Sequence, residues 1–269
     1  MVSEKIIKKV KRVVIKIGSS VLVDKKGLLS HQALFGLARS IATIQKRGVL
    51  ITLVSSGAIA SGMHYLGFKK KPRKITELQA CAAVGQPILI QKYQKALSAA
   101  RLQVAQVLLT RDDISNRKRY LNAKHTLTEL LSQKVIPIIN ENDTVVTDEI
   151  RVGDNDNLAA LVTDIVDADL LILLTDQDGF YTSDPSKDPT ALYIPVVKNL
   201  DKRHFASASD TDKVTSVGGM LTKLHAAQKA ARFGIPTIIA NGKDPKVLQR
   251  IFTGQPVGTL FLSKKKGVG

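Results

Sequence analysis

Short, uninterrupted apolar runs alternate with amphipathic helical patterns along this chain, and this alternation constrains its fold more than any other feature. Seven runs read as buried strands: residues 12–18, 49–57, 104–110, 135–139, 169–175, 236–240 and 258–262. Helical patterns fall between them: residues 30–46, 58–68, 76–101, 117–133, 220–233 and about 245–252. Strands that are apolar on both sides need helices on both faces of their sheet. The pattern therefore predicts an α/β fold, a three-layer αβα sandwich with a mainly parallel, open sheet.

Three details extend this prediction. Ser30 is a suitable N-cap for its helix. The long helical pattern at 76–101 contains Gly85 and Pro87, where we expect an interruption. Residues 178–216 are rich in Asp, Ser, Pro and Lys, and we expect them to leave the core.

The composition is that of a soluble globular protein, with 44% hydrophobic and 23% charged residues among 269. The single cysteine, Cys81, excludes a disulfide framework and favours a buried, inert thiol. The N-terminus lacks the uninterrupted apolar segment of an export signal, and no segment approaches the ~18 apolar residues of a membrane span. We therefore expect a soluble, cytoplasmic protein with no membrane contact.

The net charge of +17 raises the question of a nucleic-acid partner. Lysine and arginine fall in scattered patches, such as "KKKPRK" at 69–74. Aromatic residues make up only 4% of the chain and tryptophan is absent, so platforms for stacking on bases are scarce. The charge is better interpreted as a solvated surface that attracts anionic metabolites. RNA binding remains the alternative.

Small or acidic residues follow four of the predicted strands. They are Gly18-Ser19-Ser20, Ser55-Ser56-Gly57, Asn140 to Asp143, and Thr175-Asp176. Each group alone could form a turn. The carboxyl ends of parallel strands, however, meet at one edge of the sheet, where ligands bind. Together the four groups predict a binding site for a polar small molecule at that edge.

Common catalytic signatures are absent from the sequence. Gly57 and Gly62 have the spacing of phosphate-loop glycines, but Met63 and His64 follow where Lys and Ser or Thr are required. GxGxxG and GxSxG do not occur, and the five histidines show no metal-ligand spacing. We expect His225 at the surface or at a cap. These observations disfavour a dinucleotide site, a serine hydrolase and a zinc enzyme.

Three glycine-rich strand-to-helix turns remain as candidates for phosphate binding: "KIGSS", "SSGAIASG" and "VGGMLTK". Two of them carry a lysine. Lys16 lies in a strand flanked by apolar residues, where a solvated lysine is an awkward interpretation. Lys223 would ordinarily be a solvated helix residue, but Gly218-Gly219 just before it favours contact with a phosphate.

These residues belong to segments that occur in the same order in the amino acid kinase family: "VVIKIGSSVL", "VSSGAIASG", "PIINENDTV", "RVGDNDNLAALV", "LLILLTDQDGFYTSDP" and "GGMLTKLHAA". From about residue 12 to residue 261 the chain resembles this family, and it is most similar to the glutamate 5-kinases within it. The "LLTD..G.Y..DP" pattern is shared across the family. "INEND" followed by "VGDNDNLAAL" points to glutamate rather than acetylglutamate, aspartate, carbamate or uridylate.

The resemblance implies one amino acid kinase domain over 1–269, with a glutamate-binding side at about 1–160 and a nucleotide-binding side at about 161–269. It implies transfer of a phosphoryl group from ATP, with Mg²⁺, to the γ-carboxylate of L-glutamate, the first step of proline biosynthesis. Feedback inhibition by L-proline and a homo-oligomer, dimer or tetramer, are implied as well. The chain ends soon after "GTLF", so we expect no C-terminal RNA-binding-like (PUA) domain, which disfavours a nucleic-acid partner.

The resemblance also assigns roles to individual residues. Lys16 and Lys223 are implied to stabilise the transition state. Four residues are implied to hold glutamate: Ser56, Asp143, Asn155 and Asp156. Asp156 could instead orient the lysines. Nucleotide contacts are implied for Lys16, Thr175, Asp176, Val217, Gly218, Gly219, Met220, Leu221, Thr222 and Lys223. No side chain is expected to bind Mg²⁺ directly, and Asp176 would act on it indirectly.

Alternatives remain for some of these residues. Many relatives have Gly-Thr-Gly-Gly-Met-Ser-Thr-Lys before the nucleotide helix, whereas Val217 and Leu221 here replace two hydroxyl residues. Side-chain contacts to phosphate are in question there, although backbone contacts could remain. Asp154 or Asn155 could also cap a helix. The competing functions are another amino acid kinase with a different carboxylate acceptor, and an inactive basic RNA-binding relative.

Overall fold

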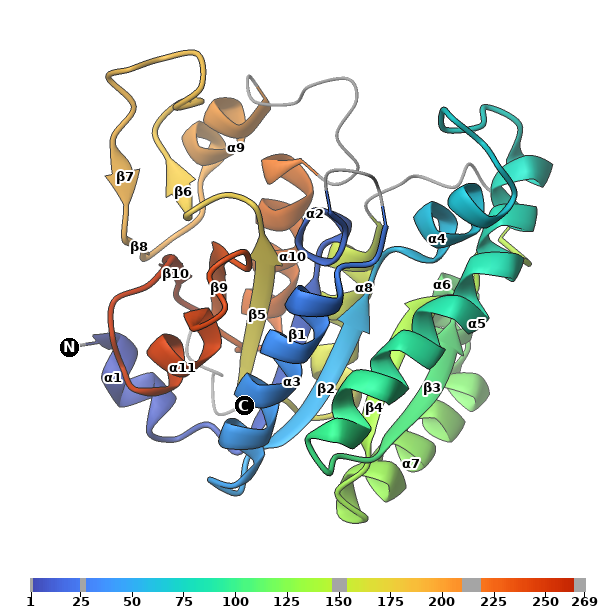
Figure 1. Cartoon of the computed structure of the whole chain (residues 1–269). Helices are drawn as coiled ribbons and strands as arrows, with labels where there is room; N and C mark the ends of the chain where they lie inside the picture. Colours follow the sequence, from blue (N-terminus) through green and yellow to red (C-terminus); the bar gives the residue numbers. More distant parts are fainter. Residues whose placement is uncertain (1, 25–27, 147–153, 210–218, 264–269) are drawn as a thin grey trace.

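A central sheet organises the computed structural model, which describes residues 2–24, 28–146, 154–209 and 219–263. Within these residues the sheet has eight strands in the order β3-β4-β2-β1-β5-β9-β10-β8 (Figure 1). The strands are β1 Arg12–Ile17, β2 Leu50–Ser55, β3 Val104–Leu109, β4 Ile136–Glu141, β5 Leu170–Thr175, β8 Val196–Val197, β9 Thr237–Asn241 and β10 Thr259–Phe261. Neighbours pair in parallel except β9 and β10, which are antiparallel. The prediction of a mainly parallel sheet is confirmed.

Helices cover both faces of this sheet, as the apolar strands require. They are α1 Val2–Ile7, α2 Ser19–Leu22, α3 His31–Gln45, α4 Ala58–Tyr65, α5 Ile75–Ala99, α6 Arg111–Ser115, α7 Arg117–Ser132, α8 Asp154–Ile165, α9 Lys202–Ser209, α10 Met220–Arg232 and α11 Val247–Phe252. One hydrophobic core packs α3, α5 and α11 against the sheet, and a second packs α7, α8 and α10 against the opposite face (Figure 1). The predicted three-layer arrangement is confirmed.

Local sequence explains where the central elements form. All six residues of β5 are buried, as a strand in the middle of a parallel sheet must be. The side chain of Ser30 accepts a hydrogen bond from the backbone N–H of Ala33, so it is the N-cap of α3, as predicted. Cys81 is fully buried inside α5.

Two expectations about elements are wrong. Helix α5 runs through Gly85 and Pro87 without a break, because the packing of its buried face outweighs the one intrahelical hydrogen bond that proline removes. The described part of the segment 178–216, which ends at residue 209, does not leave the core entirely. It forms a two-stranded hairpin, β6 Phe180–Tyr181 with β7 Tyr193–Ile194, and then supplies β8 at the edge of the main sheet. His225 is exposed on α10, as expected.

Two glycines let α4 and α5 cross with their backbones in contact. A Cβ atom on Gly62 would lie 1.8 Å from the carbonyl oxygen of Cys81. A Cβ on Gly85 would lie 1.8 Å from the carbonyl oxygen of Ala58. Only a residue without a Cβ fits at either position. Because α4 begins just after β2, this crossing brings the middle of α5 to the carboxyl edge of the sheet.

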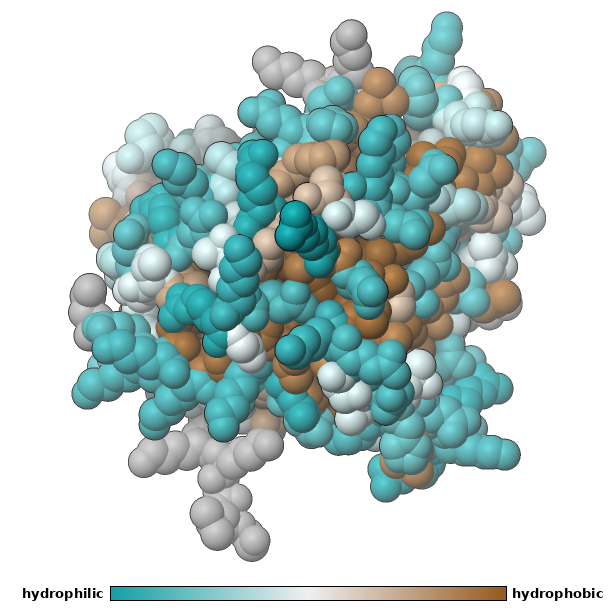
Figure 2. Space-filling model, turned by 60° about the horizontal axis from the view of Figure 1, so that its bottom comes forward, coloured by the Kyte–Doolittle hydropathy of each residue, from teal (hydrophilic) through white to brown (hydrophobic). Residues whose placement is uncertain are grey.

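The lower face of the molecule carries charge and apolar surface together. Figure 2 shows hydrophilic residues around much of this face, with hydrophobic residues gathered toward its middle. Such a mixture is ordinary for a protein surface. Among the residues that the structure describes, no helix combines the length and the apolar character needed to cross a bilayer.

Candidate active site

The four polar strand ends predicted from the sequence lie on adjacent strands. In space β4, β2, β1 and β5 are consecutive, and their carboxyl ends share one edge of the sheet. The chain builds the β2 and β4 side first and then crosses to the other side of β1 with β5. Parallel sheets bind ligands at this kind of switch point. The strand ends therefore form one candidate site.

Lys16 enters this site from β1, the strand at the switch point. It pairs in register with Val54 on β2 and Leu173 on β5. Side chains alternate along a strand, so Lys16 shares a face with Val14, which packs in the core beneath α8 and α10. Only 4% of Lys16 is exposed. The interpretation of Lys16 as a solvated surface lysine is therefore excluded.

Asp156 forms ion pairs with two buried lysines, Lys16 on β1 and Lys223 at the start of α10. It lies in the first turn of α8, and its Oδ1 is 2.8 Å from Nζ of Lys16. Its Oδ2 is 3.2 Å from Nζ of Lys223, which lies in the first turn of α10. The hydroxyl of Thr222 donates to the same Oδ2 at 2.8 Å. Asp156 is fully buried and Lys223 is 4% exposed, so the three charges form a triad that is shielded from solvent.

The charges of this triad depend on one another. Burial alone would raise the pKa of the Asp156 carboxyl, but the ammonium groups of Lys16 and Lys223 overcome that effect and hold the pKa at about 2. Burial lowers the pKa of Lys16, and the neighbouring carboxylate partly opposes this shift. With all three groups ionised, the triad has a net charge of +1. Helices α8 and α10 also direct the positive ends of their dipoles toward this edge.

A chain of side-chain amides lies beside the triad. The Nδ2 of Asn155 donates to Oγ of Ser56 at 3.2 Å and to Oδ1 of Asn140 at 3.1 Å. The Nδ2 of Asn140 in turn donates to Oε1 of Gln86 at 2.8 Å. Asn155 precedes Asp156 in α8, so the amide chain and the charge triad share one helical turn. This turn begins at Asp154, which places Asn155 inside the helix rather than at its cap.

A cavity of about 240 Å³ lies beside Lys223 of the triad. Its walls combine the "TDQDGFYTSDP" segment after β5 with the start of α10. They include Thr175, Asp176, Gly219, Met220 and Lys223. This cavity unites the two segments that the resemblance assigns to the nucleotide.

The remaining predicted residues occupy different places. Asp143 follows β4 on the same strand end as Asn140. Thr222 contacts Asp156 instead of lining the cavity. Leu221 packs against the hydrophobic core, so a hydroxyl at this position would not be directed into the cavity lining. Val217 and Gly218 lie outside the described residues.

Two residues of the site were given no individual role from the sequence. Asn140 is buried at the carboxyl end of β4. It belonged to a predicted strand-end group, but no separate role was assigned to it within that group. Gln86 lies in the middle of α5, 54 residues before its partner Asn140. The sequence pattern around it is that of an ordinary helix, so no signal pointed to it.

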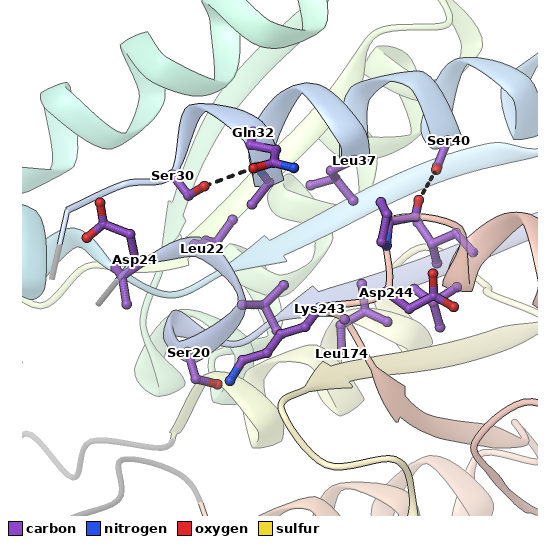
Figure 3. A pocket seen from close by; sticks show the side chains of 17 residues that line it. Ser20, Leu22, Asp24, Ser30, Gln32, Leu37, Ser40, Leu174, Lys243 and Asp244 are labelled. Atoms are coloured by element: carbon purple, nitrogen blue, oxygen red, sulfur yellow. Dashed lines mark hydrogen bonds between the residues drawn. The ribbon is translucent and has the colours of Figure 1, made fainter. Parts of the chain in front are cut away.

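A larger cavity of about 590 Å³ shares no lining residue with the first. Figure 3 shows Ser30, Gln32, Leu37 and Ser40 along one side of it and Ser20, Leu174 and Lys243 along the other. Leu174 precedes Thr175 on β5 and faces the opposite side of the sheet from Leu173. Neither lysine of the triad lines this cavity.

Known proteins resemble the chain over most of its length. Residues 11–241 match the amino acid kinase family. The glutamate 5-kinase of Geobacter metallireducens is 49% identical over 263 residues, which are 98% of this chain and 70% of that protein. The glutamate 5-kinase of Azoarcus sp. is 51% identical over 255 residues, 95% of this chain and 69% of that protein.

Two solved structures share the fold at low sequence identity. A UMP kinase from Bacillus anthracis aligns with a TM-score of 0.62 and 19% identity, covering 95% of this chain and 97% of the other. An isopentenyl phosphate kinase from T. acidophilum aligns with a TM-score of 0.65 and 16% identity, covering 93% and 99%.

Proposed function

The chain belongs to the amino acid kinase family, among the glutamate 5-kinases, and we propose that it transfers the γ-phosphoryl group of ATP to the γ-carboxylate of L-glutamate. The products are L-glutamyl 5-phosphate and ADP. One observation carries this proposal. The Lys16–Asp156–Lys223 triad connects a cavity of about 240 Å³, lined by Lys223, with an amide network that includes Asn155.

The chemistry needs charge more than it needs a base. The γ-carboxylate of glutamate has a pKa of about 4.3, so it is ionised at neutral pH and attacks the γ-phosphorus without losing a proton. The difficulty is to bring one anion against another and to stabilise the charge that spreads over the transferred group. The two fixed ammonium groups supply this stabilisation, and together with the Asp156 carboxylate they have a net charge of +1.

The site also fits a Mg²⁺ ion that arrives with the nucleotide. Mg²⁺ keeps several waters and takes few protein carboxylates when it is bound through phosphates. Among the described residues no three acidic, histidine or cysteine side chains form a cluster for a metal. Asp176, an exposed carboxylate on the cavity wall, would contact the ion through water. The ion would supply additional screening of phosphate charge.

The test of this function is a trap for the acyl phosphate. The protein is incubated with ATP, Mg²⁺, hydroxylamine and one acceptor, and hydroxamate is measured. We expect a signal with L-glutamate and at most a few per cent of it with L-aspartate or N-acetyl-L-glutamate. A signal with another acceptor alone would keep the kinase and change its substrate. RNA binding that weakens with salt, without hydroxamate from any acceptor, would favour the inactive relative.

The pH dependence should reveal the buried lysine. We expect kcat to stay nearly constant between about pH 6 and 8, since the nucleophile is already ionised. It should then fall as pH rises through the pKa of Lys16, at a lower pH than the ~10.4 of a free lysine, because burial lowers that pKa. Replacement of Lys16 by arginine should move the decline upward, as the guanidinium stays charged. An unchanged decline would assign it to another group, such as the substrate amine.

Three further features of the proposal rest on the resemblance to glutamate 5-kinases alone. They are feedback inhibition by L-proline, assembly into a homo-oligomer and a cytoplasmic location.

A further inference from the structure

Gln86 is a buried amide that the phosphoryl-transfer chemistry does not use directly. It lies in α5, is 9% exposed, and accepts a hydrogen bond from Nδ2 of Asn140 at 2.8 Å through its Oε1. The backbone crossing at Gly62 and Gly85 places it at the carboxyl edge of β4. Burying a polar side chain costs free energy unless its polar atoms form hydrogen bonds.

The hydrogen bonds beyond Gln86 have a fixed direction. Because Asn140 gives its Nδ2 to Gln86, its Oδ1 faces Asn155 as an acceptor. Asn155 therefore presents its Nδ2 to Asn140, and the same nitrogen also donates to Ser56. A primary amide has two N–H donors, and here both are used.

This direction leaves two groups for a ligand. The Oδ1 of Asn155 is buried and has no hydrogen-bond partner among the described residues. A buried carbonyl without a donor is costly and calls for a missing partner. The hydroxyl of Ser56 accepts from Asn155, so its own hydrogen can serve another acceptor. One acceptor and one donor suit the α-ammonium and α-carboxylate of an amino acid.

We propose that Gln86 is a positioning residue that, through Asn140, holds Asn155 with its carbonyl oxygen ready for the α-ammonium of the acceptor amino acid. This rests on the proposed function and names the part of L-glutamate that is recognised. At neutral pH the α-ammonium is the only hydrogen-bond donor of L-glutamate, since both carboxylates only accept. If Gln86 is lost, Asn140 loses the acceptor that fixes its amide, and its Nδ2 can then turn against that of Asn155.

Three variants test this role. Gln86→Met keeps an unbranched side chain of similar volume but removes the acceptor. Gln86→Glu keeps an oxygen acceptor for Asn140. Gln91→Met changes an exposed glutamine on the same helix and is the control. Initial rates are measured against both substrates, and L-glutamate binding is measured by calorimetry.

We expect Gln86→Met to raise the KM and Kd for L-glutamate about tenfold, as for the loss of one aligned hydrogen bond. The KM for ATP and kcat should stay within about threefold of wild type. Gln86→Glu should keep the glutamate KM within about threefold, and Gln91→Met should match wild type. A purely structural role would instead raise the KM for both substrates alike. It would also give the same result for Gln86→Met and Gln86→Glu.

Opposite results would overturn the proposal. They are a glutamate KM within twofold of wild type in Gln86→Met, or equal losses in Gln86→Met and Gln86→Glu. If Gln86→Met does not fold, Gln86→Glu decides alone, and a tenfold rise in its glutamate KM with unchanged ATP KM counts against the acceptor role. Wild-type protein that neither binds nor phosphorylates L-glutamate would contradict the proposed function itself, which separates the two failures.

Discussion

Replacing Lys223 with methionine is expected to lower kcat for glutamyl phosphate formation by about 10²–10³, and replacing Lys16 with methionine by a similar factor. Both ammonium groups are held by the buried Asp156 carboxylate, that of Lys16 at 2.8 Å and that of Lys223 at 3.2 Å. Each is therefore fixed before the reaction begins, in a site where water screens its charge poorly. Methionine has a similar length and no charge, so packing changes little while the stabilising cation is lost.

Steady-state rates at saturating ATP and glutamate measure this effect, with Lys92→Met, an exposed position on α5, as the control. A change confined to the KM for ATP, with kcat within threefold of wild type, would contradict it. That result would mean that the lysine binds the nucleotide equally well before and during phosphoryl transfer.

The double replacement of both lysines extends the same argument to stability. Either single variant leaves Asp156 with one cation, whereas the double variant leaves a fully buried carboxylate without any. Removing the partners of a buried charge costs about 3–5 kcal/mol. The double variant should therefore unfold at much lower urea concentration than either single variant.

Much of the site could be predicted from the sequence, because the carboxyl ends of adjacent parallel strands lie side by side at one edge of the sheet. Apolar runs that stop at a polar group mark β1, β2, β4 and β5, and these four strands are adjacent in the sheet. Lys16 was recognisable because a lysine between apolar strand residues has to be buried with a partner. The partner, Asp156, was predicted as a site residue, and the structure shows that it contacts both lysines.

Other parts could not be predicted because they depend on distances between helices. Gln86 reaches Asn140 only because α4 and α5 touch at two glycines, and no periodicity in either helix encodes that contact. The edge strand β8 has only two residues, too short to stand out from the polar segment around it. The continuity of α5 past Pro87 was likewise decided by tertiary packing rather than by local preference.

Replacing Gly62 or Gly85 with alanine is expected to destabilise the protein by about 3 kcal/mol or more, the upper range for an overpacked site. The added methyl group would lie 1.8 Å from a backbone carbonyl oxygen of the facing helix in either case. A flexible side chain could rotate away, but backbone inside a helix cannot. The two helices must therefore separate along their crossing. Urea unfolding of each variant measures the loss.

Gly36→Ala is the matched control, because Gly36 is also buried inside a helix, α3. There the new methyl group would lie 3.6 Å from Cβ of Pro245, an ordinary contact. Alanine favours the helix by up to about 1 kcal/mol over glycine. This variant should be as stable as wild type or slightly more stable. Equal stability of Gly62→Ala, Gly85→Ala and Gly36→Ala would mean that α4 and α5 do not cross at backbone contact.

The same separation should also reach the proposed glutamate site. Gln86 follows Gly85, and α4 follows the strand end that carries Ser56, so moving the helices apart shifts both ends of the amide network. The cavity proposed for the nucleotide is lined by the end of β5, the segment after it and the start of α10, which do not take part in this crossing. In whatever fraction of Gly85→Ala remains folded, the KM for L-glutamate should therefore rise more than the KM for ATP. Equal increases in the two KM values would mean that the crossing does not position the glutamate site in particular and is a purely structural contact.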